Sequence, residues 1–342
     1  MTASEQMLAL VEGSKNLRRL CREYETESVT VHLKELVGGA FSLYAAATIR
    51  RTGGVHVFVA EDRDAAAYLL NDLYALLDER RILFFPSSYK RSIVYGAEDA
   101  QGVVQRTATM HAVRNFTGKG YLVVCTCPEA LAERVADAEA LQRETITVRV
   151  GDWISIEVLE QALVDASFTR VDFVYEPGQY SVRGGIVDVF SYSESKPYRL
   201  DFFGDEVDSI RRFNISSQLS SDRLERVEII PDLNAGTPAA AKVSFARFAG
   251  AEASWWFYDA DFVLRRVNDI RRRTLSDMEH PDEIDSLLTS RNSLVADLSG
   301  SRIFLLRDNL PERPAAATVK FATSPQPKFN KNFEMLADDM IR

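Results

Sequence analysis

The sequence predicts an α/β protein built on a parallel sheet, with an inserted α+β domain whose sheet is antiparallel. Up to about residue 145, apolar strand runs alternate with helical periodicity, which is typical of βαβ units with right-handed crossovers. From about residue 146 to 230, one helix is followed by closely spaced strands, the pattern of an antiparallel sheet. A chain of 342 residues is also long for one core and favours two or three domains.

The elements of the first part follow from the spacing of apolar residues. Short apolar runs predict strands at 29–32, 55–60, 82–85 and 121–125. Helical spacing predicts helices at 38–50, 62–77 and 100–113, and another helix that begins at Pro128. Together they predict a first domain at residues 1–145.

The inserted domain is predicted at residues 146–231 and the remainder at 232–342. A helix is expected at 156–166, strands follow through Ile230, and the Pro- and Gly-containing segment 231–238 resembles a linker. Beyond it lie an aromatic run at 255–258, a helical pattern at 262–275, and strand patterns at 303–306 and 318–321. We expect these last strands to return to the first sheet.

Composition excludes several classes of protein. The net charge of −9 argues against a broad nucleic-acid surface, although three consecutive arginines at 271–273 could meet phosphate. Such a cluster is more often a solvated helix face. The sparse cysteines predict buried free thiols at Cys125 and Cys127. No signal pattern and no run of about 18 apolar residues occurs, which predicts a cytoplasmic chain without membrane contact.

The loop after the first predicted strand is the place to look for phosphate binding. Gly38 and Gly39 are present there, but the Lys and the following Ser or Thr that would hold phosphates and Mg²⁺ are missing. Acidic pairs such as Glu133 with Asp137 are expected by chance among 50 acidic residues. The sequence therefore predicts the layout of a nucleotide-binding domain without catalysis, cofactor or metal.

In the segment 198–213, side chains alternate between the two faces of a predicted strand, and this alternation bears on which of them lie at the surface. Tyr198 and Leu200 fall on one strand face, whereas Arg199 and Phe203 fall on the other, before a turn at 204–205. Arginine is costly to bury and phenylalanine is costly to expose, so both on one face suggest a contact patch. An equally weighted alternative places Phe203 under a loop and pairs Arg199 with Asp201 or Asp205.

A third candidate precedes a pair of glycines. Arg183 shares a strand face with Ser181 and is followed by Gly184 and Gly185, which permit a bend or a close approach. Because arginine pairs in a planar, bidentate way with carboxylates, an acidic partner surface is plausible.

The runs 176–190 and 198–213 together resemble the UvrB-like region of the Mfd family, the bacterial transcription-repair coupling factors. The short segments 84–87, 95–96, 217–220 and 329–333 fit the same resemblance, which is weak between 239 and 315. It implies a degenerate RecA-like domain made from 1–145 and 232–342, with the inserted domain between them.

The resemblance also implies a function. The inserted domain would bind UvrA, with Arg183, Arg199 and Phe203 at the positions of the family's contact residues. The chain would be a non-enzymatic, cofactor-free part of a longer repair protein. Contacts with RNA polymerase and DNA, and translocation with ATP and Mg²⁺, would then belong to other parts. The alternative is an ATP-dependent damage-recognition enzyme of the UvrB type, which the missing phosphate-loop lysine disfavours.

Overall fold

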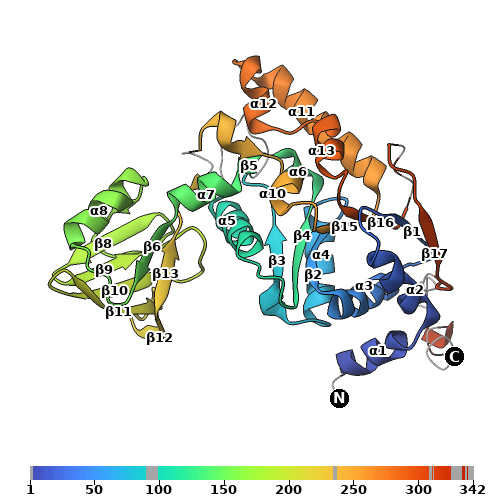
Figure 1. Ribbon diagram of the computed structural model, residues 1–342, viewed down its shortest axis with the longest axis horizontal. Helices are drawn as coiled ribbons and strands as arrows, with labels where there is room; N and C mark the ends of the chain where they lie inside the picture. The colour runs from blue at the N-terminus through green and yellow to red at the C-terminus, as the bar shows by residue number, and fades with distance from the viewer. Residues whose placement is uncertain are drawn as a thin grey trace.

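A computed structural model describes residues 3–89, 99–233, 237–307, 310, 312–324, 333–335 and 337. Motif residues at 95–96 and 329–332, and residues 234–236 of the expected linker, lie outside this part of the chain. Figure 1 shows the architecture, with a large α/β part and a smaller sheet domain at one end.

The large part is built on a seven-stranded sheet whose neighbouring strands are all parallel. Its order is β17-β1-β16-β15-β2-β4-β3. The strands are β1 (Thr30–Lys34), β2 (Gly54–Val59), β3 (Ile82–Phe85), β4 (Tyr121–Thr126), β15 (Ser254–Phe257), β16 (Arg302–Leu305) and β17 (Ala317–Lys320). The predicted fold class is confirmed, and the strands near 303 and 318 do return to the first sheet.

Helices cover both faces of this sheet, as a parallel sheet requires. One face carries α1 (Ala3–Glu12), α2 (Lys15–Tyr24), α3 (Gly39–Thr52) and α4 (Arg63–Tyr74). The other carries α5 (Ala100–Arg114), α6 (Pro128–Ala132), α7 (Ala138–Glu144), α10 (Phe245–Ala249), α11 (Ala260–Asp277), α12 (Ile284–Leu287) and α13 (Arg291–Asp297). Successive residues of a strand point to opposite faces of the sheet, so Val57 packs in one core and Phe58 in the other.

Helices α1 and α2 were not predicted from the sequence. The start of α2 has a recognisable signal, because the Ser14 side chain accepts a hydrogen bond from the Leu17 N–H at 3.1 Å. Leu17 and Leu20 then bury the inner face of the helix against α3.

The centre of the large sheet is aromatic. All four residues of β15 are buried, and the Trp256 ring stacks on Phe304 and Phe58 with centroids 4.2 and 5.2 Å apart. The indole Nε1–H donates to Nδ1 of His56 at 3.2 Å, and Nε2 of His56 lies 2.8 Å from the Gly53 carbonyl. This arrangement requires a neutral His56 with its proton on Nε2.

A buried polar cluster joins β3 to α5 and α6. Arg106 is 2% exposed, stacks on the Phe85 ring at 4.2 Å and donates to the Pro86 carbonyl at 2.8 Å. Glu133 lies 3.6 Å from its guanidinium and accepts hydrogen bonds from the hydroxyls of Ser87 and Ser88. Glu133 therefore has a structural role and does not form an acidic pair with Asp137.

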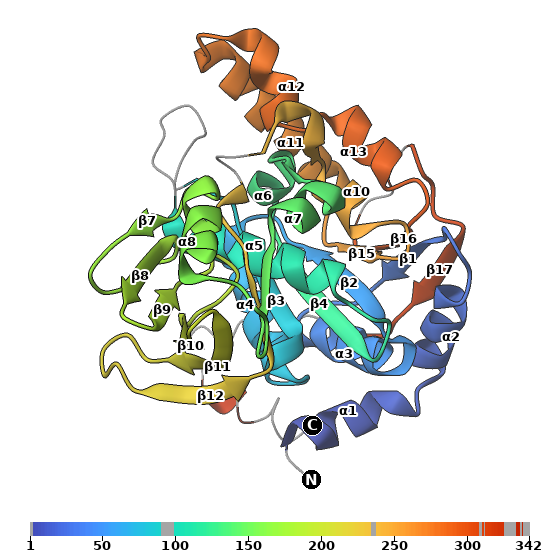
Figure 2. The same cartoon turned by 60° about the vertical axis from the view of Figure 1, so that its left-hand side comes forward.

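The small domain contains a six-stranded sheet in the order β12-β11-β10-β9-β8-β7 (Figure 2). The strands are β7 (Thr169–Arg170), β8 (Gln179–Arg183), β9 (Ile186–Val189), β10 (Tyr198–Phe203), β11 (Glu206–Phe213) and β12 (Ser220–Leu224). Every pair is antiparallel except β7 with β8, which is parallel. Helix α8 (Ile156–Asp165) packs on one face through Leu159 and Leu163.

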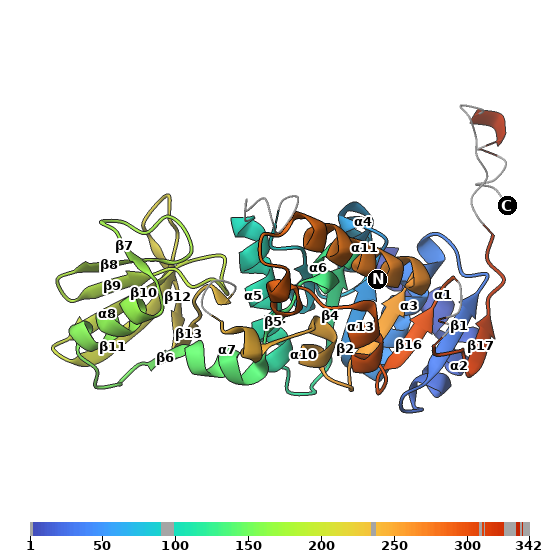
Figure 3. The same cartoon turned by 90° about the horizontal axis from the view of Figure 1, so that it is seen from above.

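A two-stranded ladder links the two parts. Strand β6 (Ile146–Arg149) enters the small domain and β13 (Arg226–Ile229) leaves it, and the two pair antiparallel. Figure 3 shows the small domain at one end of the molecule, beyond this ladder and α7. Entry and exit therefore lie side by side, which lets the chain resume its parallel sheet.

Two further expectations can be compared with the structure. Cys125 and Cys127 are buried free thiols, as predicted, and burial raises the pKa of both. Within the described residues, no helix is both long enough and apolar enough to cross a membrane.

His56 predicts a pH-dependent stability. Burial lowers the pKa of His56 from 6.5 to about 4, so below pH 6.5 the unfolded chain takes up a proton that the folded chain refuses. The free energy of unfolding should fall by about 2 kcal/mol between pH 7 and pH 5 through this group alone. Urea unfolding of the wild type and of His56→Gln at both pH values measures how much of the pH dependence comes from His56. Gln is chosen because it keeps a hydrogen-bond donor and an acceptor but does not titrate. Equal pH dependence of the two proteins would contradict this role.

Candidate functional site

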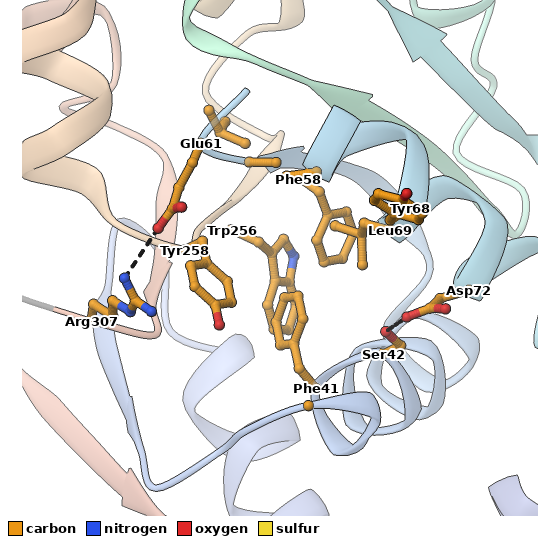
Figure 4. Close-up of a pocket in the computed structure, with 14 residues that line it drawn as sticks. Phe41, Ser42, Phe58, Glu61, Tyr68, Leu69, Asp72, Trp256, Tyr258 and Arg307 are labelled. Carbon is orange, nitrogen blue, oxygen red and sulfur yellow. Dashed lines mark hydrogen bonds and ion pairs between the residues drawn. The ribbon is translucent and has the colours of Figure 1, made fainter. Parts of the chain in front are cut away.

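The glycine loop leads into an aromatic pocket at the carboxyl edge of the large sheet. Gly38 caps α3 with φ +58, and the pocket beside it has a volume of about 390 Å³. Figure 4 shows Phe41, Phe58, Trp256 and Tyr258 facing the space. Open α/β sheets bind ligands at this edge, so the pocket lies where a nucleotide would be expected.

The charges around the pocket do not suit phosphate. Arg307 pairs with Glu61 at 3.1 Å and stacks on Tyr258 at 4.8 Å, so its charge is already compensated. On the opposite side the Ser42 hydroxyl donates to Asp72 at 2.9 Å. Among the described residues that line the pocket, two carboxylates against one guanidinium leave a net negative charge, and none is a lysine that could hold phosphate oxygens. The absence of a nucleotide at Gly38 and Gly39 stays a prediction, and the charges of the lining are consistent with it.

The face of the small sheet opposite α8 carries rows of polar side chains, and we call it the arginine face. The cross-strand register aligns Ser181, Asp188, Arg199, Arg211 and Arg223 in one row. The next row contains Arg183, Ile186, Asp201 and Ser209. Residues that face each other across antiparallel strands project to the same side, so these rows form one surface.

Asp188 is the centre of this surface. Its carboxylate is 1% exposed and receives a bidentate pair from Arg199, with Nε–Oδ1 at 2.7 Å and Nη2–Oδ2 at 2.8 Å. Arg183 adds a third charged hydrogen bond, Nη2–Oδ2 at 2.6 Å. The guanidinium groups also stack on aromatic rings, Arg199 on Phe213 at 4.4 Å and Arg183 on Phe173 at 4.8 Å. A buried carboxylate needs such partners, because desolvation would otherwise destabilise its charged form.

These contacts correct part of the interpretation of the arginines. Arg199 lies on the predicted face, but its side chain is only 15% exposed and is committed to Asp188, not to Asp201 or Asp205. It is therefore not a free outward group. Arg183 is 34% exposed and shares Asp188, which leaves part of its guanidinium accessible. Contact of either arginine with a partner stays a prediction.

Phe203 behaves as the alternation predicted. Tyr198 and Leu200 are buried, whereas Phe203 is 82% exposed and lies under no loop. Gly204 follows with φ +63 at the first position of a two-residue turn, the conformation that a type II′ hairpin needs. The turn holds Phe203 at the tip of β10, beyond the second row of the arginine face.

The basic cluster of α11 is largely used within the chain. Arg271 pairs with Asp285 at 2.7 Å and donates to the Leu288 carbonyl at 2.8 Å. Arg272 pairs with Asp269 at 2.9 Å on the same helix. These contacts favour a structural and solvated helix face over a phosphate-binding one.

Comparison with known proteins shows which family part of this chain resembles. Residues 146–234 match the UvrB interaction domain. The chain is 29% identical over 199 residues to the transcription-repair-coupling factor of Bacillus subtilis (strain 168) and 28% identical over 200 residues to that of Escherichia coli (strain K12). Each alignment covers 58% of this chain and 17% of the relative, so the chain matches only a small part of these longer proteins.

The fold and the matched segment define a class of module, in which a parallel-sheet α/β domain carries an inserted domain that is similar to the UvrB interaction domain. The particular proteins that this chain resembles are the transcription-repair-coupling factors, as its motifs predicted. The matched segment contains the whole arginine face and Phe203.

The Asp188 pairs predict that Arg199 stabilises the small domain. Arg199→Ala should lower the free energy of unfolding of the small domain by about 3 kcal/mol, because the buried Asp188 carboxylate loses its bidentate partner. Arg223→Ala is the matched control, since Arg223 is exposed on the same face, and should change stability by less than about 0.5 kcal/mol. Calorimetric unfolding measures both. Equal stability of the two variants would show that Asp188 does not need Arg199.

Proposed function

We propose that this chain is a recruitment module that binds the repair protein UvrA through the arginine face and Phe203. The observation that carries the proposal is an 82% exposed phenylalanine at the edge of an ordered polar face, within the matched UvrB interaction domain. Interfaces commonly combine an apolar anchor with a polar rim in this way.

The energetics support binding through Phe203. Burying a phenylalanine side chain gains roughly 2 kcal/mol, and folding of the chain leaves that gain unused. The hairpin turn at Gly204 presents the ring on β10 without a disordered segment, so little conformational entropy is lost on contact.

The charges support an acidic partner surface. The two rows of the arginine face contain four arginines, Arg183, Arg199, Arg211 and Arg223, against the carboxylates of Asp188 and Asp201. The face is thus locally basic on a chain whose net charge is −9. Charge complementarity between a basic face and an acidic partner surface speeds association and sets orientation more than it adds affinity.

The module would act by binding and without a cofactor. In a longer protein of the transcription-repair-coupling type, it would bring UvrA to a lesion where RNA polymerase has stalled. Polymerase contacts, DNA contacts and ATP-driven translocation with Mg²⁺ would then be supplied by other parts of that protein.

Phe203→Ala should weaken binding of UvrA about 30-fold or more, as expected for loss of an interface anchor worth about 2 kcal/mol. The melting temperature should stay unchanged, because the ring makes little contact within the chain. Tyr68→Ala is a matched control, since Tyr68 is 74% exposed on α4 of the large part. Surface plasmon resonance with UvrA measures the affinities, and wild-type affinity of Phe203→Ala would contradict the proposal.

The alternative, an ATP-dependent enzyme of the UvrB type, makes a different prediction at the aromatic pocket. The net negative lining should prevent phosphate binding, so titration calorimetry with ATP and Mg²⁺ should give no saturable heat. Parallel titrations with ADP and adenosine separate phosphate binding from binding of the base. Saturable heat with ATP and not with adenosine would favour the enzyme.

A further inference from the structure

A second exposed aromatic residue, Trp153, lies across Glu206 from Phe203. Trp153 is 78% exposed and precedes α8, in a segment that pairs with the start of β11. Trp153 and Glu206 form an antiparallel bridge. Backbone hydrogen bonds hold this segment to β11, from Ile154 N–H to the Asp205 carbonyl at 2.8 Å, from Val207 N–H to the Asp152 carbonyl at 3.0 Å and from Gly151 N–H to the Val207 carbonyl at 2.8 Å.

The register places Trp153 on the arginine face. Glu206 lies opposite Phe203 in the hairpin and opposite Trp153 in the bridge, so all three side chains project to the same side. Ile154, the next residue, points the other way and packs against the core under α8. Trp153, Glu206 and Phe203 therefore form a third row, next to Asp201 and Ser209 of the second row.

The spacing of this row is set by the sheet. Adjacent strands lie about 4.8 Å apart, so the two aromatic residues flank Glu206 at roughly 10 Å from each other. Both are anchored on hydrogen-bonded backbone, Phe203 in β10 and Trp153 in the bridged segment. A single exposed aromatic residue is ordinary on a protein surface, but a rigid pair beside a charged face is typical of binding anchors.

We propose that Trp153 is a second anchor for the same partner. This inference rests on the proposed binding of UvrA to the arginine face. It requires UvrA to present two apolar recesses about 10 Å apart, with a hydrogen-bond donor between them to meet Glu206. In that complex, acidic groups of UvrA next to the recesses would meet the arginine rows of this chain.

The first test compares affinities for UvrA with the full chain. Trp153→Ala should weaken binding about tenfold or more, whereas Trp153→Phe should stay within about threefold because it keeps an aromatic ring. Val158→Ala is the control, since Val158 is 59% exposed on α8, which covers the opposite face.

The outcomes separate this inference from the proposed function. Wild-type affinity of Trp153→Ala, together with weak binding by Phe203→Ala, would overturn the second anchor and leave the binding face intact. No binding of UvrA by the wild-type chain would overturn both.

A second test reads the fluorescence of Trp153 in the wild-type protein. The chain has three tryptophans, and Trp255 and Trp256 are buried at 0% and 1% exposure. Iodide should therefore quench mainly Trp153, and UvrA should protect that fraction of the emission. Trp153→Phe identifies the signal by subtraction. Unchanged quenching in a saturated complex would overturn the proposal.

Discussion

The whole architecture depends on completing a parallel sheet around β15. Each central strand of such a sheet must be covered on both faces and paired on both edges. Strand β15 pairs with β2 on one side and β16 on the other, and none of its residues is exposed. Because β15 follows the small domain in the sequence, the chain must leave the large sheet and return to it. The β6–β13 ladder makes this possible and places the small domain at one end of the molecule.

Within the small domain, one buried carboxylate organises that accessible face. The Asp188 carboxylate is 1% exposed and is paired with Arg183 and Arg199, which supply the hydrogen bonds that a buried carboxylate needs. The two arginines are therefore held in place by contacts within the chain, to Asp188 and to the carbonyls of Asp172 and Gln218. Phe203 and Trp153 are instead largely exposed to the part of the chain that the structure describes, and the backbone of β10 and of the bridged segment positions them. Ion pairs thus organise the centre of the face, and two exposed aromatic residues lie at its edge.

At the glycine loop the shape of the fold and the chemistry of the side chains point in different directions. The β1–α3 connection carries Gly38 beside a pocket at the edge of the sheet. Aromatic rings and paired charges line that pocket, so its shape is that of a ligand site while its charges do not suit phosphate. Fold alone would have suggested nucleotide binding, and the side chains argue against it.

The sequence by itself determined the elements with strong local periodicity, including β3, α5 and α8, and the inward direction of Tyr198 and Leu200. It also placed Phe203 on the strand face opposite Leu200, but it left open whether a loop covers the ring, and the structure shows that the ring is exposed. Only the tertiary structure decided that Arg199 pairs with Asp188, and that Trp153 stands in a row with Phe203. Those relations depend on the register between strands, including the irregularity after Asp201, and on a short bridge with no pattern of its own. Local periodicity reports which way a side chain points, and the packing of distant segments determines what it meets.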